Sequence, residues 1–184
     1  HFLLDLDGTI YQTLDLKERA YHATTSNHRS IGIEIANMGA YSPGDTRTLV
    51  DRYRRNDEGQ TIITVPEKLG DPLIRTPGFV GRPVRAEPVR GTIQGQELVQ
   101  YDLTPEQYQA LIKLTAALGR IFPKIKLDYP RGPDGKVLPH KLPDDQLTAY
   151  EGVLGHFHIQ TNKTDPGPAF DWDKVIDGAK RLAR

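Results

Sequence analysis

The fold is decided near the start of the chain, where residues 1–12 have the sequence HFLLDLDGTIYQ. Two short apolar runs flank the pair Asp7-Gly8, and an Asp-Gly pair between such runs is a strong signal of a β-hairpin. The first run has the character of the middle of a strand. We therefore expect this polypeptide to begin inside a fold.

A third strand is predicted over residues 30–36, which have the sequence SIGIEIA. Its isoleucines alternate with other residues, so they share one face, and that face is expected to be buried. Glu34 lies on the opposite face between Gly32 and Ala36. A single carboxylate between two very small residues predicts the floor of a cleft.

Two helices are predicted in the second half of the chain. Thr104, Pro105 and Gln107 form a capping-box start with proline at the first helical position, and Pro123 ends this helix. A last helix is expected from about Asp171 to Ala183. The predicted inner faces are Tyr108, Leu111, Ile112, Thr115, Leu118 and Ile121 in the first helix and Val175, Ile176, Ala179 and Leu182 in the second.

Proline and glycine recur between residues 38 and 100 without a sustained helical period. Residues 89–93 and 97–101 are predicted to pair as a hairpin across residues 94–96. We interpret about 40–100 as an elaborated loop region of one domain spanning residues 1–184, and expect this region to determine substrate selectivity.

The composition excludes several classes of protein. Lys plus Arg and Asp plus Glu both number 24 in 184 residues, and this balance argues against a general nucleic-acid binder. The absence of cysteine removes disulfides, thiolate nucleophiles and Cys-based zinc sites. No run approaches the ~18 apolar residues of a membrane span.

The segment richest in chemistry is residues 155–172, GHFHIQTNKTDPGPAFDW. Two histidines, a lysine and an aspartate lie within ten residues of one turn-rich loop. Histidine and aspartate are zinc ligands, and a lysine beside a metal can stabilise an oxyanion. The alternative is that these residues form an ordinary polar surface loop.

The pair Gly155-His156 followed by KTDPGPAFDW at residues 163–172 resembles the C-terminal signature of zinc-dependent N-acetylmuramoyl-L-alanine amidases. That family shares its fold with the peptidoglycan recognition proteins. The resemblance covers residues 1–37 and 101–176, and it implies an α/β fold with a central mixed β-sheet flanked by helices. The N-terminal blocks that occur in the family's order are residues 1–4, 7–12, 17–23 and 27–34.

The resemblance implies roles for four residues. His156 and Asp165 match two of the family's zinc ligands. Lys163 matches the lysine that stabilises the tetrahedral intermediate, and Glu34 matches the strand carboxylate that orients or deprotonates the attacking water. The alternation of the strand and the resemblance thus single out the same Glu34.

A catalytic zinc site needs three protein ligands, and the resemblance places the first, a histidine, at the end of a strand before residue 1. His1 matches a different family histidine and is not assigned as a ligand. Three alternatives follow. The chain as given lacks its first strand, another N-terminal fragment supplies that strand and its histidine, or the zinc site is incomplete. His158 is a substitute ligand if residues 156–158 are extended, since His156 and His158 then point to the same side.

Three further residues are candidates for substrate binding. His22 matches a family position near the substrate groove, and Arg29 and Asn37 are close enough in sequence to Glu34 to contact the peptide. The alternatives are a hydrogen-bonded structural histidine and two polar surface residues. His28 and His140 are expected to be solvated, and Trp172 to anchor the last helix in the core.

The resemblance implies zinc-dependent hydrolysis of the amide between N-acetylmuramic acid and L-alanine in peptidoglycan or muropeptides. The cofactor is one zinc ion, and the location is the periplasm, the cell envelope or outside the cell. A non-catalytic peptidoglycan-binding module with an incomplete metal site is the alternative. Residues 5–9, DLDGT, also match the loop of phosphatases with an aspartyl nucleophile, but that fold's other blocks are absent from the sequence.

Overall fold

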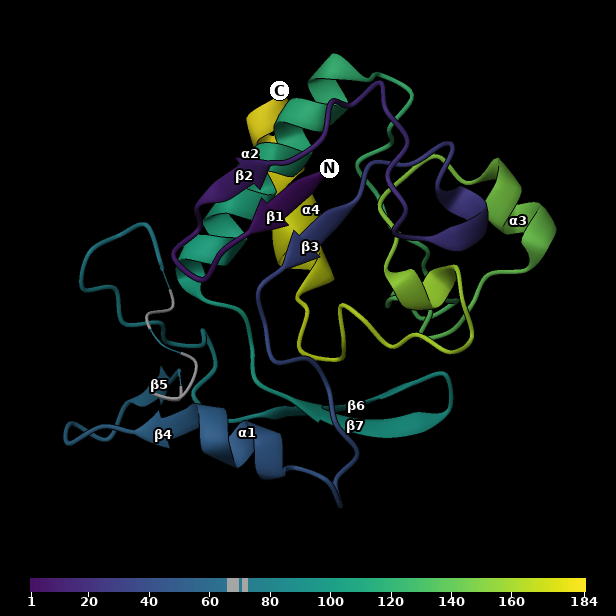
Figure 1. The fold of residues 1–184 in the computed structure, drawn as a ribbon. Coiled ribbons are helices and arrows are strands. Elements are labelled where there is room, and N and C mark those ends of the chain that lie inside the picture. Colours follow the sequence, from purple (N-terminus) through teal and green to yellow (C-terminus); the bar gives the residue numbers. More distant parts are fainter. Residues whose placement is uncertain (66–69, 71–72) are drawn as a thin grey trace.

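The computed structural model describes residues 1–65, 70 and 73–184, and its first feature is a small mixed sheet (Figure 1). Strand β1 (Phe2–Leu4) lies between β2 (Ile10–Gln12), to which it is antiparallel, and β3 (Ile33–Ile35), to which it is parallel. The predicted hairpin and third strand are confirmed. No other described strand pairs with β3.

Two helices pack behind this sheet in Figure 1, α2 (Pro105–Ile121) and α4 (Trp172–Ala183). The isoleucines of β3, at positions 33 and 35, pack against the core that Leu4 shares with α2 and α4. Burying one face leaves the other exposed, and that face carries Leu3 and Glu34, which are register partners in β1 and β3. The architecture is α/β with a central mixed sheet, as predicted.

The start of α2 has the predicted capping box. The Thr104 hydroxyl accepts from Gln107 N at 3.1 Å, and Gln107 Oε1 accepts from Thr104 N at 3.0 Å. The same hydroxyl donates to Leu6 O at 2.7 Å and so ties α2 to the β1–β2 hairpin.

The C-terminal ends of both helices differ from the prediction. Ile121 and Leu182 are 64% and 47% exposed, although both were assigned to inner faces. They lie in the last turns of α2 and α4, where the three-residue strands no longer cover the helices. Trp172, at the other end of α4, is buried against Tyr129, Phe157 and Phe170, and the prediction that it anchors the helix is confirmed.

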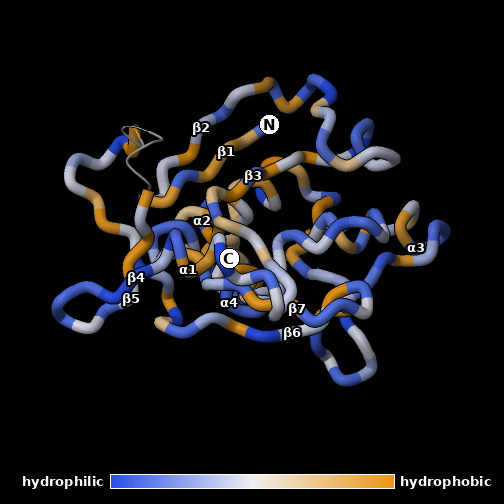
Figure 2. Tube along the Cα trace, turned by 60° about the horizontal axis from the view of Figure 1, so that its bottom comes forward, coloured by the Kyte–Doolittle hydropathy of each residue, from blue (hydrophilic) through white to orange (hydrophobic). Residues whose placement is uncertain are grey.

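The region expected to be mainly loop contains more regular structure than predicted, and residues 66–69 and 71–72 of it lie outside the described residues. The predicted hairpin is confirmed as β6 (Val89–Ile93) and β7 (Gln96–Gln100), with a two-residue turn at Gln94-Gly95. A short helix α1 (Arg47–Arg52) and a second hairpin of β4 (Tyr53–Arg55) and β5 (Thr61–Ile63) were not predicted. In Figure 2 the tip of this second hairpin is hydrophilic, whereas β1 and β3 contain hydrophobic stretches.

The remaining elements gather at one side of the sheet, on the right of Figure 1. They are the 3-10 turns η1 (Thr24–Ser26) and η3 (His156–His158) and the helix α3 (Asp144–Ala149). A small core of Ala23, Leu142, Leu147 and Ile159 joins them. None of the helices in the described part of the chain combines the length and apolarity needed to cross a membrane.

We expect Thr104→Ala to lower the free energy of unfolding by about 2 kcal/mol, because it removes a helix cap and leaves the half-buried Leu6 carbonyl without its donor. Thr104→Ser keeps the hydroxyl and should lose less than about 1 kcal/mol. Urea unfolding measures both, and equal losses in the two variants would contradict the capping role.

Candidate active site

The two predicted metal ligands lie side by side. His156 is the first residue of η3, and Asp165 lies nine residues later in the loop that follows. This loop folds back on η3, so that His156 Nδ1 is 3.1 Å from Asp165 Oδ2. The return is closed by a backbone hydrogen bond from Phe157 N to Asp165 O at 3.3 Å. The imidazole side chain is 17% exposed and the carboxylate 63%, so the pair faces solvent through the carboxylate.

The loop that carries Asp165 is held by the buried side chain of Gln100, at the end of β7. Its amide nitrogen donates to Pro166 O at 2.8 Å, and its amide oxygen accepts from Ala169 N at 3.0 Å. Gly167 lies between these two contacts with φ of +92°, and a Cβ there would be 2.0 Å from Gln100 Oε1. Only glycine fits this close approach of loop and amide.

The same amide joins the loop to the strand that carries Glu34. Gln100 Nε2 also donates to Asn37 Oδ1 at 3.2 Å, and Asn37 lies just after β3. Asn37 is further fixed by accepting from Gly39 N at 2.9 Å and donating to Tyr101 O at 3.3 Å. The structure thus places Asn37 in the framework of the site, and its predicted substrate contact stays a prediction.

The buried carboxylate of Asp102, paired with the partly exposed Arg85, supports the loop near Ala169. Asp102, 1% exposed, accepts from Arg85 Nε and from the Tyr108 hydroxyl, each at 2.6 Å. Arg85 also donates to Ala169 O. Burial and the neighbouring Asp102 carboxylate raise the pKa of Tyr108, so its hydroxyl stays protonated as a donor.

Glu34 and His22 lie close together on the exposed side of β3. Glu34 projects from the solvent face of the strand, as its alternation predicts. The His22 ring lies against the preceding glycine, since a Cβ on Gly32 would be 2.7 Å from its Cγ and Nδ1. Burial lowers the pKa of His22; the charge of the His1 amino group and His156 lower it further, and Glu34 opposes them.

His22 has a defined hydrogen bond on its other nitrogen. The Ser30 hydroxyl donates to Ser26 O at 2.6 Å, so it accepts from His22 Nε2, which is 3.1 Å away. This assigns the hydrogen of the neutral ring to Nε2. The structural and substrate-binding interpretations of His22 are thus compatible, because only Nε2 takes part in the bond to Ser30 and Nδ1 does not.

The ring nitrogens of His1 and His158 contact backbone groups of the protein itself. His1 Nδ1 accepts from Gly32 N at 3.0 Å, and its Nε2 is 3.1 Å from Glu18 O. His158 is fully buried; its Nδ1 accepts from Gly155 N at 2.9 Å and its Nε2 lies 2.8 Å from Leu138 O. Residues 156–158 form a 3-10 turn and not an extended segment, so the geometric reason for considering His158 as a ligand was wrong.

The other predicted residues lie on the surface or in the framework. Arg29 donates to the carbonyls of Leu147, Thr148 and Tyr150 and so caps the C-terminal end of α3; its predicted substrate contact stays a prediction. Lys163 is half-buried in the turn before Asp165, with its backbone N–H donating to Gln160 O at 3.4 Å. His28 and His140 are exposed.

A family model described as N-acetylmuramoyl-L-alanine amidase matches residues 1–168. The chain belongs to this amidase family. The match places it among enzymes of peptidoglycan, and it includes the sheet, α2 and the loop that carries His156 and Asp165. No curated protein and no solved structure is significantly similar to this chain.

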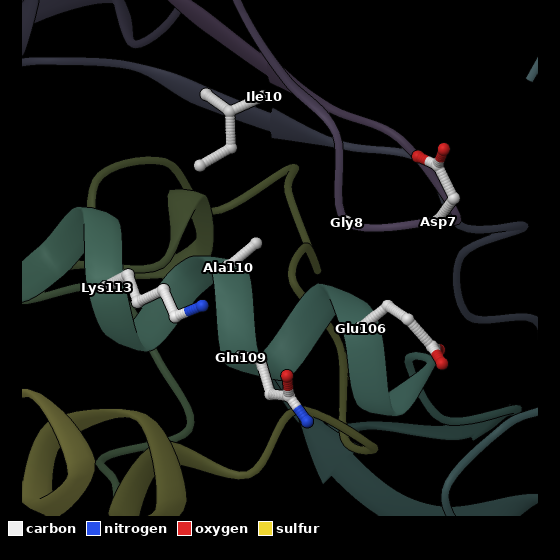
Figure 3. A pocket seen from close by; sticks show the side chains of 7 residues that line it. All are labelled: Asp7, Gly8, Ile10, Glu106, Gln109, Ala110 and Lys113. Atoms are coloured by element: carbon white, nitrogen blue, oxygen red, sulfur yellow. The ribbon is translucent and has the colours of Figure 1, made fainter. Parts of the chain in front are cut away.

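The family match overturns the phosphatase interpretation of residues 5–9. The Asp7 carboxylate accepts a hydrogen bond from Thr9 N, within its own turn, at 2.9 Å and another from the hydroxyl of the distant Thr76 at 2.6 Å. Although burial opposes it, these bonds hold the pKa of Asp7 below its ordinary value. A hollow of about 250 Å³ lies beside Asp7, between the β1–β2 turn and α2 (Figure 3). None of the predicted amidase-site residues lines this hollow.

The donor pair suits zinc in its chemistry. Zinc in proteins takes imidazole nitrogen and carboxylate oxygen, and His156 and Asp165 offer one of each at the same place. Within residues 1–65, 70 and 73–184, no group of three His, Asp or Glu side chains could hold a metal ion. A catalytic zinc site has three protein ligands, so the assignment of His156 and Asp165 as two of them stays a prediction.

Sequence reasoning missed the glutamines that hold the loop. Besides Gln100, Gln94 in the β6–β7 turn donates to Phe157 O at 2.8 Å and to Gln160 O at 3.0 Å. Gln160 Oε1 lies 2.5 Å from His156 Nε2. A glutamine has no diagnostic spacing, and nothing local to these residues could have identified their partners.

We expect the stability of the metal-free protein to fall as the pH is lowered through the range set by His158. Burial lowers the pKa of this ring from its ordinary 6.5 to about 4, so between these values the unfolded chain binds more protons than the folded one. The loss should reach up to about 3 kcal/mol, measured by urea unfolding with a chelator. His158→Gln should flatten this dependence and His140→Gln should not; equal slopes in all three proteins would contradict the assignment.

We expect Gln100→Leu to lower the free energy of unfolding by about 3 kcal/mol, because it leaves the buried partners of the amide without hydrogen bonds. Gln96→Leu, at an exposed position of the same strand, is the matched control and should change stability by less than about 0.5 kcal/mol. Urea unfolding compares the two. Similar values would show that the amide does not support the loop.

Proposed function

We propose that this protein is a zinc-dependent amidase that cleaves the bond between the lactyl group of N-acetylmuramic acid and L-alanine of the stem peptide. The observation that carries the proposal is the His156–Asp165 pair, 3.1 Å apart, in a chain of the amidase family. The Gln100 amide ties this pair to the strand of Glu34, as the three groups need if they act on one substrate bond.

His156 and Asp165 would hold the zinc ion, and the third protein ligand remains the histidine expected before residue 1. When bound, zinc polarises a carbonyl oxygen and lowers the pKa of water toward ~7.

Glu34 is the proposed general base. It takes a proton from the attacking water and passes it to the alanine nitrogen as the C–N bond breaks, which yields a lactyl carboxylate and a peptide with a free amino group. Its exposed position on β3 leaves it accessible to water and substrate. Lys163 is proposed to stabilise the oxyanion that develops on the lactyl carbonyl, a role worth about 10²–10³ in turnover where such donors are removed.

The substrate is peptidoglycan or a muropeptide, and His22, whose ring lies against Gly32 two residues before Glu34, is a proposed binding residue. Hydrolysis of this polymer implies a location in the periplasm, in the cell envelope or outside the cell. A peptidoglycan-binding module without catalysis is the second candidate, and the observation in its favour is that the described residues supply only two ligands.

Digestion of purified muropeptides separates the two functions. With zinc added, an amidase releases stem peptides with a free N-terminal alanine, which mass spectrometry identifies, and a chelator stops the reaction until zinc is restored. Binding to peptidoglycan with no release in the presence of zinc would support the binding module and overturn the proposal.

We expect Glu34→Gln to reduce turnover by at least about 10²-fold while zinc binding is unchanged, because the amide cannot accept the water proton. Glu97→Gln, an exposed substitution on β7, is the matched control and should keep full activity. Stem-peptide release and zinc content measure the two effects. Full activity in Glu34→Gln would exclude this carboxylate as the base.

A further inference from the structure

The His156 ring lies between two oxygen atoms, one at each nitrogen. Nδ1 is 3.1 Å from Asp165 Oδ2, and Nε2 is 2.5 Å from Gln160 Oε1. The two contacts differ in kind, because a carboxylate is a metal ligand whereas an uncharged amide oxygen here serves as a hydrogen-bond acceptor.

The orientation of the Gln160 amide follows from its second contact. Its nitrogen donates to Asn162 Oδ1 at 3.4 Å, which turns the amide oxygen toward His156. An amide oxygen has no hydrogen to give, so this contact places a hydrogen on His156 Nε2. In the neutral ring Nδ1 then has a lone pair directed at the Asp165 carboxylate, 3.1 Å away, and a cation between these two groups would satisfy both.

The backbone of Gln160 is held on both sides. Its N–H donates to His156 O at 3.0 Å, and its carbonyl accepts from Gln94 Nε2, also at 3.0 Å. Gln94 is itself fixed, since its N–H donates to Pro139 O at 2.8 Å and its amide oxygen accepts from Lys141 N at 3.3 Å. The side chain of Gln160 therefore starts from a fixed backbone, four residues from the ring that it contacts.

A histidine binds a metal through the lone pair of one nitrogen, and a hydrogen bond from the other nitrogen selects the tautomer. We propose that Gln160 is a positioning residue that holds His156 as the Nε2–H tautomer, so that Nδ1 and Asp165 face the same metal ion. This inference rests on the proposed function for its purpose, whereas the tautomer itself belongs to the metal-free protein.

Zinc affinity tests the consequence. Gln160→Ala should bind zinc about 10- to 100-fold more weakly, the usual effect of removing such a hydrogen-bond partner, as measured by competition with a chelating dye. Gln160→Glu keeps an acceptor oxygen at the same place and should restore affinity. Thr161→Ala, an exposed substitution beside Gln160, is the matched control and should stay within about twofold of the unsubstituted protein.

Nitrogen-15 spectra of the imidazole test the tautomer without zinc. Signals of His156 are assigned by their loss in His156→Gln. The unsubstituted protein should show the hydrogen on Nε2, and Gln160→Ala should shift it toward Nδ1, where Asp165 accepts it. Unchanged melting temperatures would show that neither effect comes from unfolding.

The outcomes separate this inference from the proposed function. The role of Gln160 is overturned if the unsubstituted protein has its hydrogen on Nδ1. It is also overturned if Gln160→Ala has the same tautomer and the same zinc affinity as the unsubstituted protein. The amidase proposal stands in both cases. An unsubstituted protein that binds no zinc and releases no stem peptide overturns the amidase proposal, and the metal-free spectra still decide whether Gln160 sets the tautomer.

Discussion

The geometry of the site depends on one buried amide, that of Gln100. Its three hydrogen bonds reach Asn37 after β3, Pro166 after the Asp165 ligand, and Ala169 further along the loop. No backbone pairing joins β3 to this loop among the described residues, so the amide takes the place that a strand contact would have. The Gln100 side chain is 2% exposed, so its own polar atoms are shielded from competing water.

The β6–β7 hairpin thereby acquires a definite role. Gln94 in its turn and Gln100 at its end hold the two sides of the loop that carries His156 and Asp165. The expectation that residues 40–100 determine substrate selectivity stays a prediction, and the β6–β7 hairpin within them supports the loop of the two proposed metal ligands. A rigid support of this kind keeps ligands in place when their own loop is largely irregular.

Features encoded by short-range patterns were predictable from the sequence. The alternation of β3 placed Glu34 on the open face, and the capping box located the start of α2. His156 and Asp165 were identified by family resemblance and lie together in the structure. The 3-10 turn at His156 is closed by backbone hydrogen bonds from His158 N to Gly155 O and from Ile159 N to His156 O, and it was missed because a three-residue turn has no periodic pattern. The glutamine contacts were missed because Gln94 and Gln100 act on carbonyls 66 residues away.

The central claim is that His156 and Asp165 form the metal locus and that His156 presents Nδ1 to it. Anomalous diffraction at the zinc absorption edge, from crystals grown with zinc, tests this claim most directly. The account predicts an anomalous peak within coordination distance of His156 Nδ1 and Asp165, with Nε2 still bonded to Gln160. A peak at another place, or one bound through Nε2, would contradict it.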